Sequence, residues 1–288
     1  MDFSRSVTDI IRERTSRRTY IKQKFEEETR EWVVNLLNSH DFESPFSKFV
    51  GKIRFELITV PEFDPREKKN LGTYGFIKGA QYFIVGAVKK SKYNREHYGY
   101  ILESIILAAT DIGLGTCWLG GFFNKNLFSA KINCKSEEIV PAITPIGYSV
   151  KRKLREKITR TVIRANKRFV WEKLFFESDF NTPVSRENLG EYTTLLESVR
   201  LAPSASNQQP WRVVKEFNKK NFHFYIVKSK TGMGLRYMKF RRLDIGIAVS
   251  HFDHTAKELG VEGTWAFEEP FISESDDYLY IISWKDKR

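Results

Sequence analysis

The chain has 288 residues, of which 41% are hydrophobic and 29% charged, a composition typical of a globular protein of one or two domains rather than a disordered chain. Two cysteines, Cys117 and Cys134, are too few for a disulfide scaffold or a four-cysteine zinc site. No run of about 18 apolar residues and no leader-like N-terminal pattern is visible, so we expect a cytoplasmic protein without a membrane anchor. The net charge of +12 favours an anionic partner or ligand.

Helical and alternating patterns follow one another along the chain. Helices are expected over residues 7–11, 27–38, 98–112, 191–199 and from about 244 to 259, and strands over residues 52–58, 81–88, 143–148, 213–214, 222–227 and 278–282. Gly113 follows the third helix as a C-cap, and Asn181-Thr182-Pro183 is typical of a turn or linker. Interleaved helices and strands predict an α/β or α+β protein, with the strand order left open.

Two segments of the chain echo each other. Four residues of the first half recur in the second half at one constant offset of about half the chain, namely Gly99, Ala109, Gly113 and Trp118 as Gly246, Ala256, Gly260 and Trp265. Chance is one explanation, because Gly and Ala are common. A duplicated half-domain is the other, and we prefer it because a helix, a glycine cap and a tryptophan recur together.

Two basic segments suit anionic ligands. Residues 14–20, Arg-Thr-Ser-Arg-Arg-Thr-Tyr, offer guanidinium forks and hydroxyl groups that fit a phosphate dianion, although an ordinary basic turn has the same composition. The stretch from Lys151 to Arg168 is a solvated basic face or, less favoured, a nucleic-acid contact, because it carries no aromatic residue for base stacking.

Two further loops have unusual compositions. Residues 202–211, Ala-Pro-Ser-Ala-Ser-Asn-Gln-Gln-Pro-Trp, form a stiff loop of small and amide side chains that a flat heterocycle can approach closely. Residues 113–121 are rich in glycine but follow a helix, which is the wrong context for a dinucleotide fingerprint. Gly120 and Gly121 either present backbone N–H groups to a ligand or form a tight turn.

Metal and hydrolytic chemistry have weak support. His251, Asp253 and His254 lie close together in sequence, but a zinc site requires further ligands. Cys117 lies beside Trp118, and we interpret it as a small buried hydrophobe rather than a nucleophile.

These segments together resemble the FMN-dependent nitroreductase family. Residues 14–18 look like its Arg-x-Ser-x-Arg/Lys pattern, residues 203–211 match its Pro-Ser-x-x-Asn-x-Gln-Pro-Trp loop at every fixed position, and residues 113–122 resemble its Gly-Leu-Gly segment. In ordinary members the proline loop comes early, where this chain has Ser44-Pro45-Phe46-Ser47 instead. The late loop makes the chain similar to single-chain, pseudo-dimeric members of that family.

The resemblance implies an α+β fold, an α/β sandwich with two tandem halves that imitate a homodimer. Residues 1–180 would form the first half and residues 181–288 a shorter second half that supplies the proline loop. One intact FMN site per chain is implied between the halves, with the other site degenerate. The implied cofactor-binding residues are Arg14, Thr15, Ser16, Arg18, Gly120, Gly121, Arg168, Pro203, Ser204, Ala205 and Asn207.

The roles of these residues also follow from the resemblance. Arg14 and Ser16, with Arg168, would hold the phosphate, and Arg18 would lie near the pyrimidine edge of the flavin. Glycine backbone amides would face the position that hydride reaches, and the proline loop would cover the ring.

The resemblance implies ping-pong reduction of a nitroaromatic or quinone by NADH or NADPH, with no side-chain nucleophile and no metal. A monomer without membrane or nucleic-acid partners is expected. Two alternatives remain open, namely an FMN-binding protein without efficient turnover and a basic nucleic-acid-binding protein.

Overall fold

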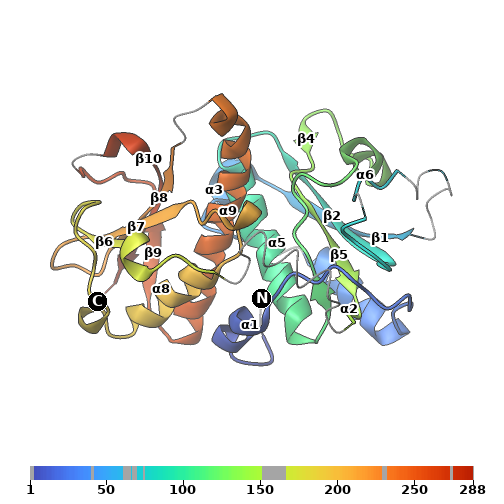
Figure 1. Cartoon of the computed structure of the whole chain (residues 1–288), viewed down its shortest axis with the longest axis horizontal. Helices are drawn as coiled ribbons and strands as arrows, with labels where there is room; N and C mark the ends of the chain where they lie inside the picture. The colour runs from blue at the N-terminus through green and yellow to red at the C-terminus, as the bar shows by residue number, and fades with distance from the viewer. Residues whose placement is uncertain are drawn as a thin grey trace. The chain divides into compact units, whose positions relative to one another are not determined.

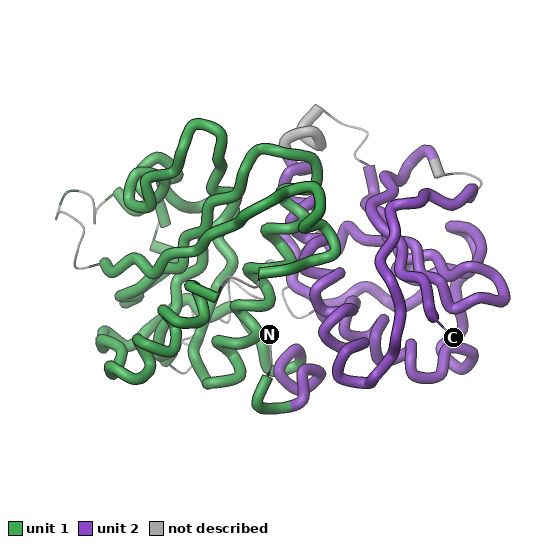
Figure 2. Tube along the Cα trace, turned by 180° about the vertical axis from the view of Figure 1, so that it is seen from behind, with its two compact units in different colours: residues 1–5, 12–160 green, residues 6–11, 161–288 purple. Residues whose placement is uncertain are grey.

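The structure is a computed structural model that describes residues 3–39, 42–60, 66, 70–73, 75–150, 167–228, 232–272 and 275–287. Contacts divide the chain into two compact units (Figure 2). Unit 1 comprises residues 1–5 and 12–160, and unit 2 comprises residues 6–11 and 161–288. The division into halves at residue 180, which concerns duplication rather than compactness, stays a prediction.

Unit 1 contains one five-stranded antiparallel sheet in the order β1-β2-β5-β3, with β4 paired to β2 (Figure 1). Its strands are β1 (Ile53–Thr59), β2 (Tyr82–Lys89), β3 (Gly115–Thr116), β4 (Glu138–Ile139) and β5 (Ile143–Gly147). Its helices are α2 (Glu27–Asn38), α3 (Ser47–Val50), α5 (Asn94–Asp111) and α6 (Lys125–Lys131).

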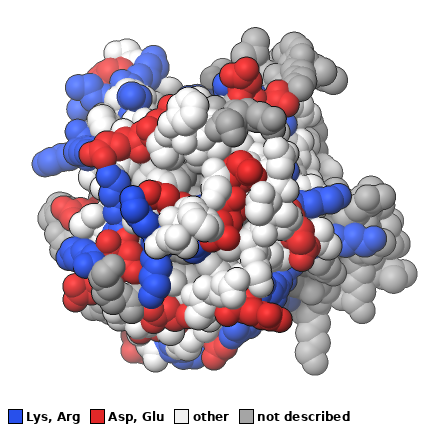
Figure 3. Space-filling model, turned by 90° about the vertical axis from the view of Figure 1, so that its left-hand side faces the viewer, with Lys and Arg blue, Asp and Glu red and all other residues white. Residues whose placement is uncertain are grey.

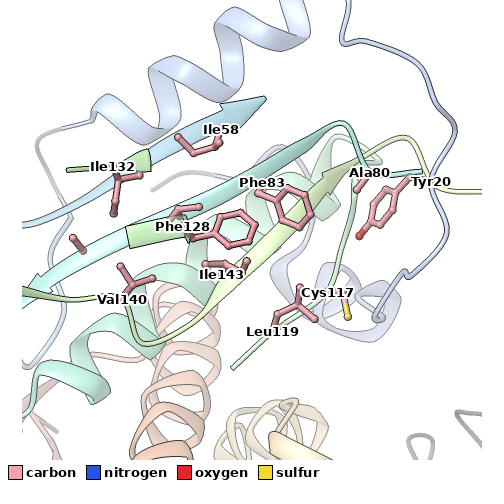
Figure 4. Packing of buried hydrophobic residues seen from close by; sticks show 12 residues of the cluster. Tyr20, Ile58, Ala80, Phe83, Cys117, Leu119, Phe128, Ile132, Val140 and Ile143 are labelled. Carbon is pink, nitrogen blue, oxygen red and sulfur yellow. The ribbon is translucent and has the colours of Figure 1, made fainter. Parts of the chain in front are cut away.

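The central strand β2 of unit 1 is covered on both faces, which explains its nearly continuous apolar sequence. On one face Phe83 packs against Phe128 of α6, with ring centroids 5.2 Å apart (Figure 4). On the other face Tyr98 of α5 donates its hydroxyl to Ala142 O at 2.6 Å and accepts from Gly86 N at 3.1 Å. Helix α5 is thereby fixed to the sheet that the Gly-Leu-Gly segment extends.

Unit 2 contains a second five-stranded sheet in the order β6-β7-β8-β10-β9, antiparallel except for the parallel pair β6–β7. Its strands are β6 (Phe175–Glu177), β7 (Trp211–Lys215), β8 (Phe222–Val227), β9 (Gly263–Ala266) and β10 (Tyr278–Asp286). Its helices are α8 (Tyr192–Leu201) and α9 (Gly232–Glu258), and short 3-10 turns span Trp171–Lys173, Arg186–Asn188, Ala205–Asn207 and Ser275–Asp277. The short helix α1 (Val7–Glu13) begins in the segment assigned to unit 2.

The sheet of unit 2 also buries both faces. Phe224 of β8 packs edge-to-face on Phe252 of α9, with ring centroids 5.4 Å apart. On the opposite face Phe180 stacks on Tyr278 at 3.7 Å and meets Tyr225 edge-on at 5.1 Å. Side chains of alternating β8 residues therefore enter two different layers.

The described helices and sheets confirm the expected α+β class. The structure differs from the sequence-based prediction at the start of α9, which lies at Gly232 rather than near Asp244. Asn181-Thr182-Pro183 lies in a turn beside β6, one of its two expected forms, in which Glu177 N donates to Thr182 O at 2.8 Å. Within the described ranges, none of the helices combines the length and apolar character that crossing a bilayer requires.

Candidate functional site

The arginine segment of unit 1 lies along the edge of its sheet. Ser16 forms a parallel bridge with Thr116 of β3, and Arg17 N donates to Thr116 O at 2.7 Å. A Cβ on Gly115 would lie 3.0 Å from Arg17 Cγ and 2.8 Å from Ser149 Cβ, so glycine permits this close approach. The structure thus brings together two of the segments that the sequence singled out.

Arg14 is matched by a buried acid. Its Nε lies 3.6 Å from Oε1 of Glu103 on α5, and the two side chains are 7% and 0% exposed. The other carboxylate oxygen of Glu103 accepts from the indole Nε1 of Trp118 at 2.6 Å. Glu103 therefore ties the arginine segment to the Gly-Leu-Gly segment through its carboxylate. Sequence reasoning missed this residue, although an acid inside the apolar pattern of a helix was a visible signal.

Arg18 differs from Arg14 in its surroundings. Its main-chain carbonyl accepts from Lys78 N at 2.8 Å, which fixes the backbone, while its Nη1 atom is buried and makes no hydrogen bond to a described residue. A buried guanidinium nitrogen without an acceptor is costly, because its hydration is lost and not replaced. The position suits a ligand that brings an acceptor atom.

The remaining predicted residues of unit 1 are Thr15, in the arginine segment, and Gly120 and Gly121, which follow β3 in the chain. Thr15 is half-buried. Gly120 is half-buried and Gly121 exposed, in a bend directly after Leu119, which pairs with Ile143 through two hydrogen bonds of 2.9 and 3.0 Å. The bend agrees with the turn interpretation of these glycines and leaves the ligand-facing interpretation as a prediction.

The proline loop of unit 2 connects α8 to β7 in a strained conformation. Three residues without the freedom of glycine have left-handed backbones: Ser206 at φ 51°, Asn207 at φ 56° and Gln209 at φ 45°. Each such residue costs about 1–2 kcal/mol, less for Asn, so the surrounding structure must hold the loop in place. Strain of this kind is concentrated at binding sites in many proteins.

A basic residue and two amides hold one side of this loop. Arg168 donates to Leu201 O at 3.0 Å and to Asn207 Oδ1 at 3.2 Å, and Asn207 Nδ2 donates to Lys167 O at 2.7 Å. Gln209, only 1% exposed, accepts from Phe169 N at 2.7 Å. Arg168 and Asn207, both predicted site residues, are thus direct neighbours. Within the loop, Ser204 Oγ accepts from Gln209 N at 2.9 Å.

An acid from α9 holds the other side of the loop. Asp244 Oδ1 accepts from Ala205 N at 3.0 Å, and its Oδ2 is buried with no partner among the described residues. Burial raises the pKa of Asp244 to about 8, against the opposing influences of the Ala205 N–H and the Arg241 guanidinium. Sequence reasoning placed Asp244 only at a helix start and therefore missed this contact.

The predicted site residues fall into two sets that belong to different units. Arg14, Thr15, Ser16, Arg18, Gly120 and Gly121 lie in unit 1, whereas Arg168, Pro203, Ser204, Ala205 and Asn207 lie in unit 2. Within unit 1 Ser16 pairs with Thr116, and within unit 2 Arg168 contacts Asn207.

The other sequence candidates have structural partners. His251 Nδ1 donates to Ser198 O at 2.9 Å, and Asp253 accepts from Trp265 Nε1 at 2.7 Å. No group of three or more His, Cys, Asp or Glu side chains suited to a metal ion occurs among the described residues. Cys117 is 4% exposed and packs among apolar side chains in Figure 4, as a small hydrophobe would.

Of the basic stretch, residues 151–166 lie outside the described residues. On the face that Figure 3 shows, Lys and Arg side chains are interspersed with Asp and Glu rather than gathered into one patch. That face therefore offers no continuous track for a polyanion.

Comparisons with known proteins identify a family and a similar fold. Residues 6–256 match the sequence profile of a family described as "Putative TM nitroreductase". A "putative nitroreductase" from Thermotoga maritima has a similar fold, with a TM-score of 0.60, 20% identity, and coverage of 99% of this chain and 95% of that chain.

Other similar structures cover about half of this chain. An FMN-dependent nitroreductase from Clostridium difficile R20291 covers 50% of this chain and 88% of its own, at 22% identity and a TM-score of 0.39. An iodotyrosine deiodinase bound to FMN and 3-iodo-L-tyrosine covers 51% and 91%, at 18% identity and a TM-score of 0.37. No curated protein matched the sequence.

The family match extends over most of the chain, including the arginine segment, the Gly-Leu-Gly segment and the proline loop. It confirms the resemblance seen in the sequence and supports an oxidoreductase function in general. The chain belongs to the nitroreductase family that this profile defines.

Proposed function

We propose that this protein is an FMN-dependent oxidoreductase that uses NADH or NADPH to reduce an electron-poor acceptor of the nitroaromatic or quinone type. The single observation that carries the proposal is Arg18, whose buried Nη1 has no hydrogen-bond acceptor among the described residues. Family membership and the FMN-dependent relative add support. One FMN per chain is expected, because only unit 2 carries the proline loop and only unit 1 the arginine segment.

The residues of unit 1 fit the anionic parts of FMN. Arg14, whose Nε lies 3.6 Å from Glu103, would offer its terminal nitrogens to a phosphate alongside Thr15 and Ser16. Arg18 supplies a fixed cation and a donor for the electron-rich edge of the ring. Gly120 and Gly121 have no side chains, so a ring can approach their backbone closely.

The residues of unit 2 fit the flat surface and the phosphate side of the cofactor. Pro203, Ser204 and Ala205 form a small-residue surface, and Asn207 and Arg168 hold that surface in place through their mutual hydrogen bond of 3.2 Å. We assign Arg168 the second task of balancing phosphate charge.

When bound, FMN would supply the redox chemistry that links oxidation of the nicotinamide to reduction of the acceptor in two separate half-reactions. The protein's own contribution is positional and electrostatic. The buried Arg18 guanidinium would favour a negative charge on the flavin ring, because little water is present there to screen the interaction. The proline loop would exclude water from the ring. No side-chain nucleophile is needed for this chemistry.

The proposal is tested by titrating the purified full chain with FMN and then adding NADH or NADPH with a simple quinone. We expect about one FMN per chain and quinone-dependent oxidation of one or both nicotinamides. Arg18→Ala should weaken FMN binding about 10- to 100-fold, because a charge-assisted hydrogen bond in a buried place is lost. Arg30→Ala is the matched control, since Arg30 is half exposed and pairs only at 3.9 Å with Glu27.

Each result has a distinct meaning. Failure of the wild-type chain to bind FMN would overturn the proposal. Equal FMN affinity of the Arg18→Ala and Arg30→Ala variants would refute the role of Arg18. Tight FMN binding without oxidation of either nicotinamide would favour the second candidate, an FMN-binding protein without efficient turnover, for which the extensive internal hydrogen bonding of Asn207 is a supporting observation.

A further inference from the structure

The proline loop requires an anchor on its helix side. Its left-handed residues Ser206, Asn207 and Gln209 would relax to more favourable backbones if the loop were released. Arg168 restrains Asn207, but the start of the loop, at Ala205, is restrained by the side chain of Asp244 on α9. This N–H···O contact of 3.0 Å joins residues 39 positions apart.

We propose that Asp244 is a positioning residue that holds the proline loop in its strained conformation, and that it does so as a neutral carboxylic acid at neutral pH. The part of this inference that concerns FMN rests on the function proposed above. The part that concerns the loop does not, because it is a property of the chain without ligand.

The geometry around Asp244 favours the neutral form. The side chain is 4% exposed, and only Oδ1 has a partner, the Ala205 N–H. An ionised Asp244 would lose most of its hydration on burial while one oxygen has no hydrogen-bond partner among the described residues, which costs free energy. A protonated Asp244 avoids this cost and can still accept the Ala205 N–H through its carbonyl oxygen. Burial accordingly raises the pKa of Asp244 to about 8.

The charged groups around Asp244 are few. Arg241, one turn away on α9, favours ionisation of Asp244, but donates its Nη1 to Val227 O at 2.6 Å. Burial, with the nearby Arg241 charge, lowers the pKa of Arg212 on β7. Arg212 donates to Gln209 O at 3.2 Å.

Helix α8 contributes no charge to the Asp244 site. Its two oppositely charged side chains, Glu197 and Arg200, form an ion pair with each other. The loop presents only the neutral Ala205 N–H. Among the residues that the structure describes, Arg241 is the cation that favours ionisation of Asp244. We therefore expect ionisation to draw Arg241 or water inward and to loosen the loop.

The other unit has an anchor at the matching position. At the constant offset that relates the two echoing segments, His97 of α5 corresponds to Asp244. His97 Nδ1 lies 2.7 Å from Oγ of Ser44, in the loop that follows α2. The same helical position therefore restrains the same connection in both units, which makes an incidental contact in unit 2 a poor explanation.

The test measures amide hydrogen exchange of the peptide spanning residues 203–211 in the full chain, without FMN, from pH 6 to 9.5. After correction for intrinsic exchange, the wild type should show slow exchange that accelerates as the pH passes about 8. Asp244→Asn keeps an oxygen acceptor and stays neutral, so its protection should match that of the wild type at pH 6 and show no step. Asp244→Ala should exchange about tenfold faster at every pH, because the anchor is gone.

Asp253→Asn is the matched control. Asp253 is another buried acid of α9, but its partners are Trp265 and Lys257 rather than the loop. This variant should keep the wild-type loop protection and its pH step. The proposal is overturned if Asp244→Ala leaves loop exchange unchanged, or if Asp244→Asn retains the step.

FMN affinity supplies an independent second readout. The wild-type dissociation constant should rise above pH 8, that of Asp244→Asn should not, and NAD(P)H oxidation need not be measured. If the chain binds no FMN, the proposed function fails while hydrogen exchange still decides the role of Asp244. If FMN binds but the two variants and the wild type share one pH profile, the positioning role toward FMN fails alone.

Discussion

Four strands of each unit follow the same order, and the connection before the first of these strands differs between the units. In unit 1 the antiparallel order is β1-β2-β5-β3, and in unit 2 β7-β8-β10-β9 repeats it, with β6 added at one edge. The long helices end alike, because Leu114 N donates to Ala109 O at 2.8 Å, and Val261 N donates to Ala256 O at 2.9 Å. These residues stand at the constant offset noticed in the sequence.

The units differ in the connection that follows α2 in unit 1 and α8 in unit 2. In unit 1 residues 42–52 include Ser44-Pro45-Phe46-Ser47 and the short α3, with Phe46 fully buried. In unit 2 residues 202–210 form the strained proline loop. The anchors differ too, since His97 holds one connection and Asp244 the other. The comparison teaches that two units with the same strand order differ in this connection and in the helix residue that restrains it.

The largest expected difference between the units concerns their buried acids. Trp118 donates to Glu103 in unit 1, and Trp265 donates to Asp253 in unit 2. Glu103→Ala also strips Arg14, which is 7% exposed, of its carboxylate, so we expect a loss of about 3–5 kcal/mol in unfolding free energy. Asp253→Ala removes the ion-pair partner of Lys257, which is 68% exposed, so about 1–2 kcal/mol is expected.

Urea unfolding of the two variants measures this difference. Glu103→Gln serves as the control, because it keeps an acceptor for Trp118 and removes only the charge. Equal losses for the two alanine variants would show that the Arg14 pairing adds nothing, and the two units would then be equivalent in this respect.

The anchors should give the two units opposite pH dependence. Burial lowers the pKa of His97 to about 4 and raises that of Asp244 to about 8. A neutral buried His97 contributes stability that is present above its unfolded pKa and is lost as pH falls toward 4. A protonated Asp244 contributes stability that is fully present below its unfolded pKa and is lost as pH rises through 8.

Substitution of each anchor isolates its slope. Between pH 7 and pH 5, the stability of His97→Asn relative to the wild type should rise by about 2 kcal/mol. The relative stability of Asp244→Asn should fall over the same interval by about 2–3 kcal/mol. Urea unfolding at the two pH values checks both, and slopes of equal sign would contradict the assigned protonation states.

Elements with strong apolar spacing could be predicted from the sequence. Helix α2 occupies the expected residues 27–38, and the buried strand β2 begins within one residue of its prediction. The start of α9 was missed, because Gly232 and Gly234 at its beginning are typical of a turn, although Tyr237, Phe240 and Leu243 recur at helical spacing before Ile245. Strands of two residues such as β3 exist only through their neighbours, so no local signal announces them.

The candidate site was predictable in its motifs and not in its supports. Residue types at fixed spacing singled out Arg18, Arg168 and Asn207. The partners that orient such residues come from distant parts of the chain, as Glu103 does for Arg14 and Asp244 for Ala205. A single sequence contains no record of these pairs, since tertiary packing alone brings them together. Buried acids inside helical apolar patterns were the available hint.

The smallest expected effect is the loss of stability on substituting the glycine that follows α5 or α9, and it tests whether these two helix ends are equivalent. Gly113 and Gly260 follow α5 and α9 with left-handed backbones, at φ 80° and φ 64°, and a Cβ at either position would meet no atom within 4 Å. Substitution by alanine therefore carries only the backbone cost, with no clash in either unit, and each variant should lose about 1 kcal/mol of unfolding free energy. The double variant should lose the sum, because a Cβ at either position contacts no other described residue. If one substitution costs several kcal/mol more than the other, the two caps differ in tertiary environment. The similarity between the units would then hold for their sheets and not for their helix ends.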